Sequence, residues 1–202
     1  MIYVCGDSFA TPDPDYGPCW VDLLKQHANV ITLAQVCASN LMIAQQVDRA
    51  LDQRADAVIV LFTASTRFQT RIDNELVPYS IHSLNETTPF DQRQLSLLKQ
   101  HTAEFFDLDT AIYQNQLTIE ATLYRLQHSS IPFIWDQGGF EHPSYGGNQK
   151  YFEQFDNTRS EINLWDHAPR RSYRPYYHIK DPAVHQRAAN YYYDRFKAQN
   201  SI

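Results

Sequence analysis

The sequence has little of three features that would mark a specialised class of protein: cysteine pairs, long apolar runs and an excess of basic residues. Its 202 residues include 3 cysteines, and this odd number of widely spaced thiols favours reduced cysteines over a disulfide framework or a zinc site. The longest apolar run, residues 57–62, is too short to span a bilayer. The net charge of −6 gives no electrostatic reason to expect nucleic-acid binding.

No basic segment followed by a long apolar one is visible near the N-terminus, so no secretory signal is predicted. We therefore expect a protein made in the reducing cytosol, with neither nucleic acid nor membrane as a partner. Association with a virus particle stays open as an alternative location, and the oligomeric state is not indicated. A length of 202 residues with a 43% apolar share fits one globular domain over residues 1–202.

Segments typical of strands alternate with segments typical of helices. Strands are predicted in four short apolar runs, at residues 2–5, 29–33, 57–62 and 132–135. Helices are predicted between and after them, at residues 19–27, from the N-cap Ser39 to about residue 51, over 91–127, and from the N-cap Asp181 to about residue 197. This order predicts a three-layer α/β/α sandwich with a mainly parallel, five-stranded, flavodoxin-like sheet.

Two long segments lack this periodicity. Residues 64–90 are polar with weak patterning, and residues 140–177 are rich in aromatic residues, proline and arginine. We expect both to be irregular loops that wall a ligand cleft, because long loops inside a compact domain are usually functional.

The end of the first strand is the strongest candidate for chemistry. In parallel sheets the ligand crevice lies at the carboxyl ends of the strands, and this strand ends in Gly6-Asp7-Ser8. Gly6 is expected to allow a sharp turn, and Asp7 and Ser8 can bond nearby backbone amides. The Ser8 hydroxyl would then lie at the rim of the sheet, where a substrate can reach it.

Three short blocks resemble those of the SGNH (GDSL-type) hydrolase superfamily. They are Gly6-Asp7-Ser8, the second strand running into Ala38-Ser39-Asn40, and a histidine just before the last helix. The pattern is most similar to divergent members found in bacteriophages. The resemblance implies an SGNH-type fold and a serine-dependent, esterase-type hydrolase that removes O-acyl groups from a carbohydrate. It also implies a small-molecule or glycan ester as substrate, and no cofactor.

The resemblance also suggests which residues react. Ser8 matches the family's nucleophile, and His178, three residues before Asp181, matches the base that activates it. His185 is the rival base, one turn inside the expected helix. The family places an Asp three residues before its His, where this chain has Pro175. Asp181 or a backbone carbonyl would orient the ring instead, and a Ser–His dyad is the alternative.

The family's oxyanion donors are matched in part. The Ser8 N–H matches the first donor, and Cys37, whose N–H would be the second, stands where the family has a glycine. The family's Asn after the third strand is absent, so the hydroxyl of Thr63 or Ser65 would have to donate.

Two further residues belong to the candidate substrate-binding set. Asn40 follows the second strand and is also a common cap or turn former. Arg67 either grips an anionic or glycan substrate or closes its loop through a carboxylate.

Two other classes of function stay open. The departures at positions 37, 63 and 175 fit a non-catalytic glycan-binding or virion structural protein that keeps the fold. A nucleotide or phosphate binder would use Gly138-Gly139, but no P-loop lysine follows. A metal site is not expected, because the available ligands lack zinc-motif spacing: His142, Asp166, His167 and His178.

Overall fold

The structure is a computed structural model that describes residues 1–12, 17–81, 84, 90–136, 152–162, 164, 179 and 181–199. Its central sheet has 4 strands in the order β2-β1-β3-β6. All neighbouring strands in it are parallel. The strands are β1 (Ile2–Cys5), β2 (Val30–Thr32), β3 (Ala57–Leu61) and β6 (Phe133–Asp136).

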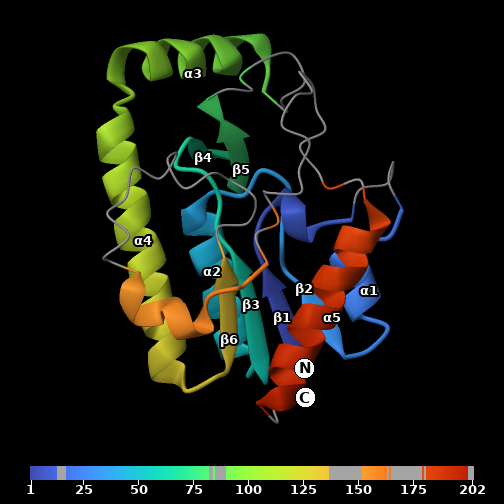
Figure 1. Ribbon diagram of the computed structural model, residues 1–202. Helices are drawn as coiled ribbons and strands as arrows, with labels where there is room; N and C mark the ends of the chain where they lie inside the picture. Colours follow the sequence, from blue (N-terminus) through green and yellow to red (C-terminus); the bar gives the residue numbers. More distant parts are fainter. Residues whose placement is uncertain are drawn as a thin grey trace.

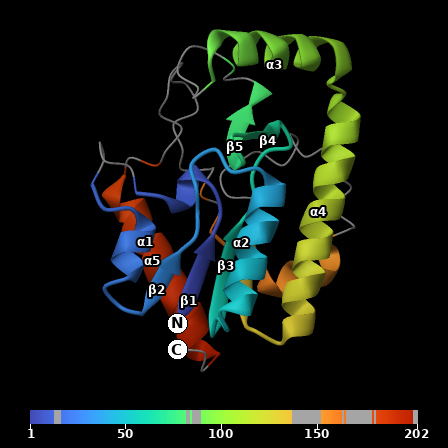
Figure 2. The same ribbon diagram turned by 180° about the vertical axis from the view of Figure 1, so that it is seen from behind.

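Helices cover both faces of the sheet (Figures 1 and 2). On one face, α1 (Trp20–Leu24) and α5 (Pro182–Ala198) share a core with every second strand residue, such as Ile2 and Val4. On the other face, α2 (Asn40–Asp52) and α4 (Leu108–Ser129) share a core with the alternate residues. The predicted three-layer fold class is confirmed.

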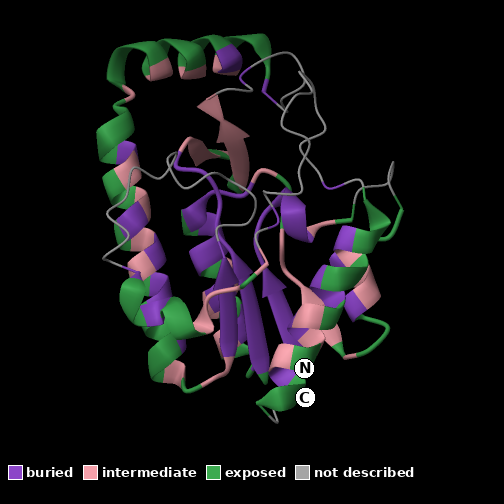
Figure 3. Ribbon diagram, in the orientation of Figure 1, coloured by how far each residue is buried: buried purple, intermediate pink, exposed green. Residues whose placement is uncertain are grey.

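The strands β1 and β3 are apolar along their whole length because both faces of the sheet are covered. All five residues of β3 are buried, and so are all four of β1 and of β6 (Figure 3). Side chains in a strand point alternately to opposite faces, so a sheet covered twice needs apolar residues at every position. The short apolar runs therefore identified these strands correctly.

Residues 67–80 form a β-hairpin, and the expectation of an irregular loop there was wrong. The strands β4 (Arg67–Ile72) and β5 (Glu75–Ser80) pair antiparallel. The turn between them is Asp73-Asn74, where φ is 47° and 68°. Asp and Asn tolerate this left-handed region better than other side chains, and two such residues in succession are typical of hairpin turns.

The long helix predicted over residues 91–127 is two helices. The first is α3 (Gln92–Phe105), which crosses the end of the molecule away from both termini (Figure 1). The chain then turns at Phe106 and Asp107 into α4. The Asp107 side chain accepts a hydrogen bond from Thr110 N at 2.7 Å, so it caps the new helix.

The helix caps predicted from the sequence are confirmed. The Ser39 hydroxyl accepts from Met42 N at 3.2 Å, and Asp181 caps α5 with Pro182 following it.

The predicted fifth strand of the central sheet is not found among the described residues. Most of the segment 140–177 lies outside the described residues; the part that is described includes a 3-10 helix, η5 (Glu153–Thr158). In the described part of the chain, no helix is both long and apolar enough to cross a bilayer.

Replacing the cap Asp107 tests the break between α3 and α4. We expect Asp107→Ala to lower the free energy of unfolding by about 1 kcal/mol, because the Thr110 N–H loses its partner. Asp107→Asn should stay close to the wild type, since an asparagine caps equally well. Urea denaturation measures both. Equal losses in the two variants would show that the charge, and not the cap, matters there.

Candidate active site

Ser8 begins a single turn of 3-10 helix, η1 (Ser8–Ala10), directly after β1. Asp7 caps this turn, because its Oδ1 accepts from Phe9 N at 3.0 Å. At the other end, the N–H and the hydroxyl of Thr11 both donate to Ser8 O, at 3.3 and 3.0 Å. The Ser8 residue is 7% exposed, and neither its hydroxyl nor its N–H is hydrogen-bonded to any described residue. Within the described part of the chain, both groups of this residue are therefore without a hydrogen bond at the carboxyl edge of the sheet.

Both backbone groups of Gly6 are hydrogen-bonded to one side chain, that of Gln46. Its N–H donates to Gln46 Oε1 at 2.7 Å, and its carbonyl accepts from Gln46 Nε2 at 3.3 Å. A Cβ on Gly6 would lie 3.2 Å from Leu61 Cβ and 3.4 Å from Ala10 Cβ. The chain turns directly after Gly6, into the 3-10 turn at Ser8–Ala10, but the φ of Gly6 is not in the left-handed region. The glycine is therefore needed for the close approach of β1 and β3, and not for an unusual backbone conformation.

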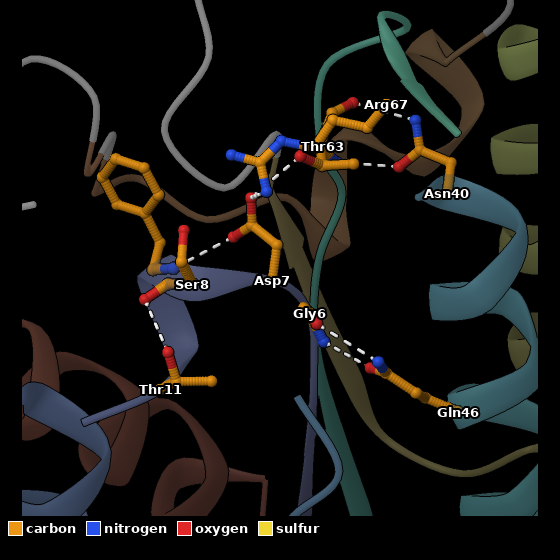
Figure 4. Close-up of polar contacts among 9 residues, drawn as sticks. Gly6, Asp7, Ser8, Thr11, Asn40, Gln46, Thr63 and Arg67 are labelled. Atoms are coloured by element: carbon orange, nitrogen blue, oxygen red, sulfur yellow. Dashed lines mark hydrogen bonds and ion pairs between the residues drawn. The ribbon is translucent and has the colours of Figure 1, made fainter. Parts of the chain in front are cut away.

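The Asp7 carboxylate joins three segments of the chain (Figure 4). It is fully buried, and while Oδ1 caps η1, Oδ2 accepts from Thr63 Oγ1 at 2.8 Å. The same Oδ2 forms an ion pair with Arg67 at 3.1 Å. The Arg67 side chain is 13% exposed. This contact is the loop-closing alternative that the sequence left open for Arg67.

Asn40 is bonded to the backbone where β3 ends (Figure 4). Its Oδ1 accepts from Thr63 N at 2.7 Å, and its Nδ2 donates to Thr63 O at 2.8 Å. The second Nδ2 hydrogen is directed to Asn115 Oδ1, at 2.7 Å. Both amide hydrogens of Asn40 are thus used inside the protein. The hydrogen-bonding groups of Thr63 are also satisfied inside the protein: its backbone N–H and C=O by Asn40, and its hydroxyl by donating to Asp7.

Cys37 lies in a turn beside the Ser8 segment. Ala38 N donates to Gln35 O at 3.1 Å and closes this turn, in which Cys37 has a φ of 63°. That left-handed conformation favours glycine, the residue of the resembled family. Gln35 N in turn donates to Gly6 O at 3.1 Å, so the turn is tied to the end of β1. The Cys37 N–H has no hydrogen bond with the residues that the structure describes.

His185 has both ring nitrogens bonded inside the protein. Its Nδ1 accepts from Trp20 N at 3.2 Å, which leaves the proton on Nε2, and Nε2 lies 2.9 Å from Ile179 O. The ring therefore links α1 to the residue that follows His178. His178 itself lies outside the described residues. Asp181 Oδ1 accepts from Ala183 N at 2.9 Å, so this carboxylate caps α5.

The structure thus brings together Ser8, Thr63, Arg67 and Asn40 at one edge, with the Cys37 turn tied to the same strand end. Ser65 is fully buried in the turn between β3 and β4, and its carbonyl accepts from Asn115 Nδ2 at 3.4 Å. The roles of these residues in binding or catalysis stay predictions.

Sequence reasoning did not predict that three polar side chains hold this edge of the sheet together. Asp7 was expected only to bond a nearby amide, and Gln46 and Asn115 were not singled out. Both amides lie on helices with polar outer faces, so no local pattern distinguishes them from exposed residues. The Gly-Asp-Ser block was the one usable signal, because an Asp directly before a helical turn is a typical cap.

The thiols of Cys5 and Cys19 are not activated. Burial raises the pKa of the Cys5 thiol, and burial raises the pKa of Cys19 to about 11. Both thiols stay protonated at neutral pH, and a protonated thiol is a poor nucleophile.

Among the described residues, no group of three or more His, Cys, Asp or Glu is arranged to hold a metal ion. The metal ligands considered from the sequence all lie outside them.

No protein-family model and no curated protein matches this chain. Among solved structures, the fold is similar to that of the psychrotrophic esterase EstA from Pseudoalteromonas sp., in a structure inhibited by monoethylphosphonate. The TM-score is 0.53 and the identity is 12%, and the match covers 100% of this chain and 98% of that chain. At this identity the likeness establishes a shared fold.

Removing the Asn40 amide should cost stability. We expect Asn40→Ala to lower the free energy of unfolding by about 3 kcal/mol, because buried backbone groups of Thr63 lose their partners. Gln45→Ala, at an exposed position of the same helix, should change it by less than about 0.5 kcal/mol. Chemical denaturation compares the two variants. Equal effects would mean that the Asn40 contacts contribute nothing.

Replacing Cys37, whose φ is in the left-handed region, by glycine should raise stability instead of lowering it. Cys37→Gly should raise the free energy of unfolding by about 1 kcal/mol, because glycine adopts this φ without steric cost. Cys37→Ala keeps the cost and should leave stability close to that of the wild type. Thermal unfolding of both variants is the measurement. A rise in the alanine variant as well would assign the effect to loss of the thiol.

Proposed function

We propose that this chain is a serine-dependent hydrolase of the esterase type. Ser8 Oγ attacks the carbonyl carbon of an ester, and His178 accepts its proton. The tetrahedral oxyanion is stabilised by the N–H groups of Ser8 and Cys37. His178 then returns the proton to the leaving alcohol, and water releases the acyl group from Ser8.

One observation carries the proposal: the Ser8 hydroxyl lies at the carboxyl edge of a parallel sheet without a hydrogen bond to any described residue. A serine that served only as a turn former would direct its hydroxyl to a backbone group, as Thr11 does here. The N–H groups of Ser8 and Cys37, which bond none of the described residues, support the same reading, because oxyanion donors must be free to bind substrate. The shared fold with the esterase EstA is further support.

The choice of base follows from the bonding of His185. A general base needs a ring nitrogen free to accept a proton, and both nitrogens of His185 are bonded to the backbone of other residues. This leaves His178 as our candidate. The next residue, Ile179, is 2% exposed within the core that α5 covers, so the chain beside His178 is anchored.

A non-catalytic glycan-binding protein is the second candidate. The observation that favours it is the bonding of Thr63, whose hydroxyl and N–H are both used inside the protein. The site then has no side-chain oxyanion donor from this residue. Loss of one such donor typically lowers kcat by about 10²- to 10³-fold.

Labelling by a fluorophosphonate, together with hydrolysis of p-nitrophenyl acetate, tests the proposal. We expect the wild type to be labelled at Ser8, and Ser8→Ala to lose labelling and about 10³-fold or more of the hydrolysis rate. His178→Ala should be impaired to a similar degree. His185→Gln should keep most of the activity, because a glutamine can accept from Trp20 N and donate to Ile179 O.

Two outcomes would change this proposal. A folded wild-type protein that is neither labelled nor active, but binds glycans, would establish the binding protein. Loss of activity in His185→Gln at unchanged melting temperature, with His178→Ala active, would exchange the two histidines. For the substrate we propose an O-acylated carbohydrate, and acetate release from acetylated polysaccharides, compared between the wild type and Ser8→Ala, tests that part separately.

A further inference from the structure

Arg67 binds the residue that directly precedes the proposed nucleophile. The ion pair joins Arg67 Nη1 to Asp7 Oδ2 at 3.1 Å, and the Asp7 side chain is fully buried. A buried carboxylate is stable only when charge and hydrogen bonds compensate for the water it has lost. Within the described residues, the cation at this carboxylate comes from the hairpin, and not from the sheet to which Asp7 belongs.

The hairpin is fastened to the carboxyl edge by alternate residues of β4. Arg67 binds Asp7, and two residues later Gln69 accepts a hydrogen bond from the Ser39 hydroxyl. Residues i and i+2 of a strand point to the same face, so this face of the hairpin lies against the site. The ring of Phe68, between them, packs edge-on against Phe106, with ring centroids 5.8 Å apart. The opposite face of β4 is therefore held by the segment that joins α3 to α4.

We propose that Arg67 is a positioning residue of the hydrolytic site, which makes the β4–β5 hairpin part of the catalytic machinery. This inference rests on the function proposed above. Arg67 acts through Asp7: by holding Oδ2 it fixes the carboxylate, so that Oδ1 keeps the Phe9 N–H and the turn that begins at Ser8. The orientation of the Ser8 hydroxyl and N–H then depends on a side chain 59 positions away (67 minus 8).

Figure 4 shows how this arrangement works. The Arg67 side chain extends from the start of β4 toward the Asp7 carboxylate, and Asp7 lies between it and the η1 turn. Thr63 Oγ1 donates to the same oxygen that pairs with Arg67, so a hydrogen bond and an ion pair together hold Oδ2 in one position. A small misplacement of a reacting group is enough to slow a reaction strongly, because the geometry of attack is narrow. Loss of Arg67 should therefore slow the attack by Ser8 without removing any atom that reacts.

The test compares variants of the pair with a matched control on the same strand. The variants are Arg67→Ala, Asp7→Asn and the double variant. The control is Arg71→Ala, whose exposed guanidinium bonds, among the described residues, its own hairpin turn at Asn74 O. The measurements are the rate of fluorophosphonate labelling at Ser8, kcat and KM for a neutral and an anionic p-nitrophenyl ester, and the melting temperature.

We expect Arg67→Ala to lower the labelling rate and kcat by about 10- to 100-fold, with KM for the neutral ester changed less than about twofold. Asp7→Asn should show a similar loss. The double variant should be no slower than the slower single variant, because the two side chains act as one unit. Methylguanidinium in solution should restore part of the rate of Arg67→Ala, and Arg71→Ala should match the wild type.

Several results would overturn the inference. One is a wild-type labelling rate in folded Arg67→Ala; if that variant does not fold, a wild-type rate in Asp7→Asn has the same force. Another is a rise in KM confined to the anionic ester, which would make Arg67 a substrate ligand. A wild type that is labelled while the variants are unaffected contradicts only this inference. A wild type that is not labelled at Ser8 contradicts the proposed function, and the inference with it.

Discussion

The Asp7 carboxylate lies fully buried where β1 ends, and its two oxygens bind groups from the η1 turn, from the end of β3 and from β4. Removing a charge from water costs several kcal/mol, so the carboxylate is tolerated only while these partners stay in place. The partners hold the carboxylate, and the carboxylate in turn holds the partners. Each of the three segments is fixed relative to the others because each satisfies the same buried charge.

Side-chain amides perform a related task at the same edge. Where parallel strands end, backbone N–H and C=O groups lose their partners in the sheet and need others. Two residues of α2 supply them: Asn40 pairs with both backbone groups of Thr63, and Gln46 pairs with both of Gly6. The helix that covers this face therefore also completes the hydrogen bonding of β1 and β3. These hydrogen bonds hold the strand ends beside Ser8 in place, which a nucleophile proposed to act in one orientation requires.

The sequence was sufficient for features that depend on neighbouring residues. The continuous apolar strands and the helix caps at Ser39, Asp107 and Asp181 are local signals, although the one at Asp107 was overlooked within a long helical pattern. The Asp73-Asn74 turn was also readable, and its hairpin was missed because Pro78 and polar residues weaken the strand pattern. Contacts such as Arg67 with Asp7 link positions 60 apart (67 minus 7), and no local rule selects one carboxylate among many.

The link made by His185 has a consequence for the order in which the chain folds. The His185 ring, in α5, accepts a hydrogen bond from Trp20 N, which lies 165 positions earlier in the sequence. The first and last helices also share one core. During synthesis, the face of the sheet covered by α1 and α5 stays open until the last helix has left the ribosome, because such distant contacts form late. Ile179, whose carbonyl the His185 ring contacts, is therefore anchored only after α5 has formed.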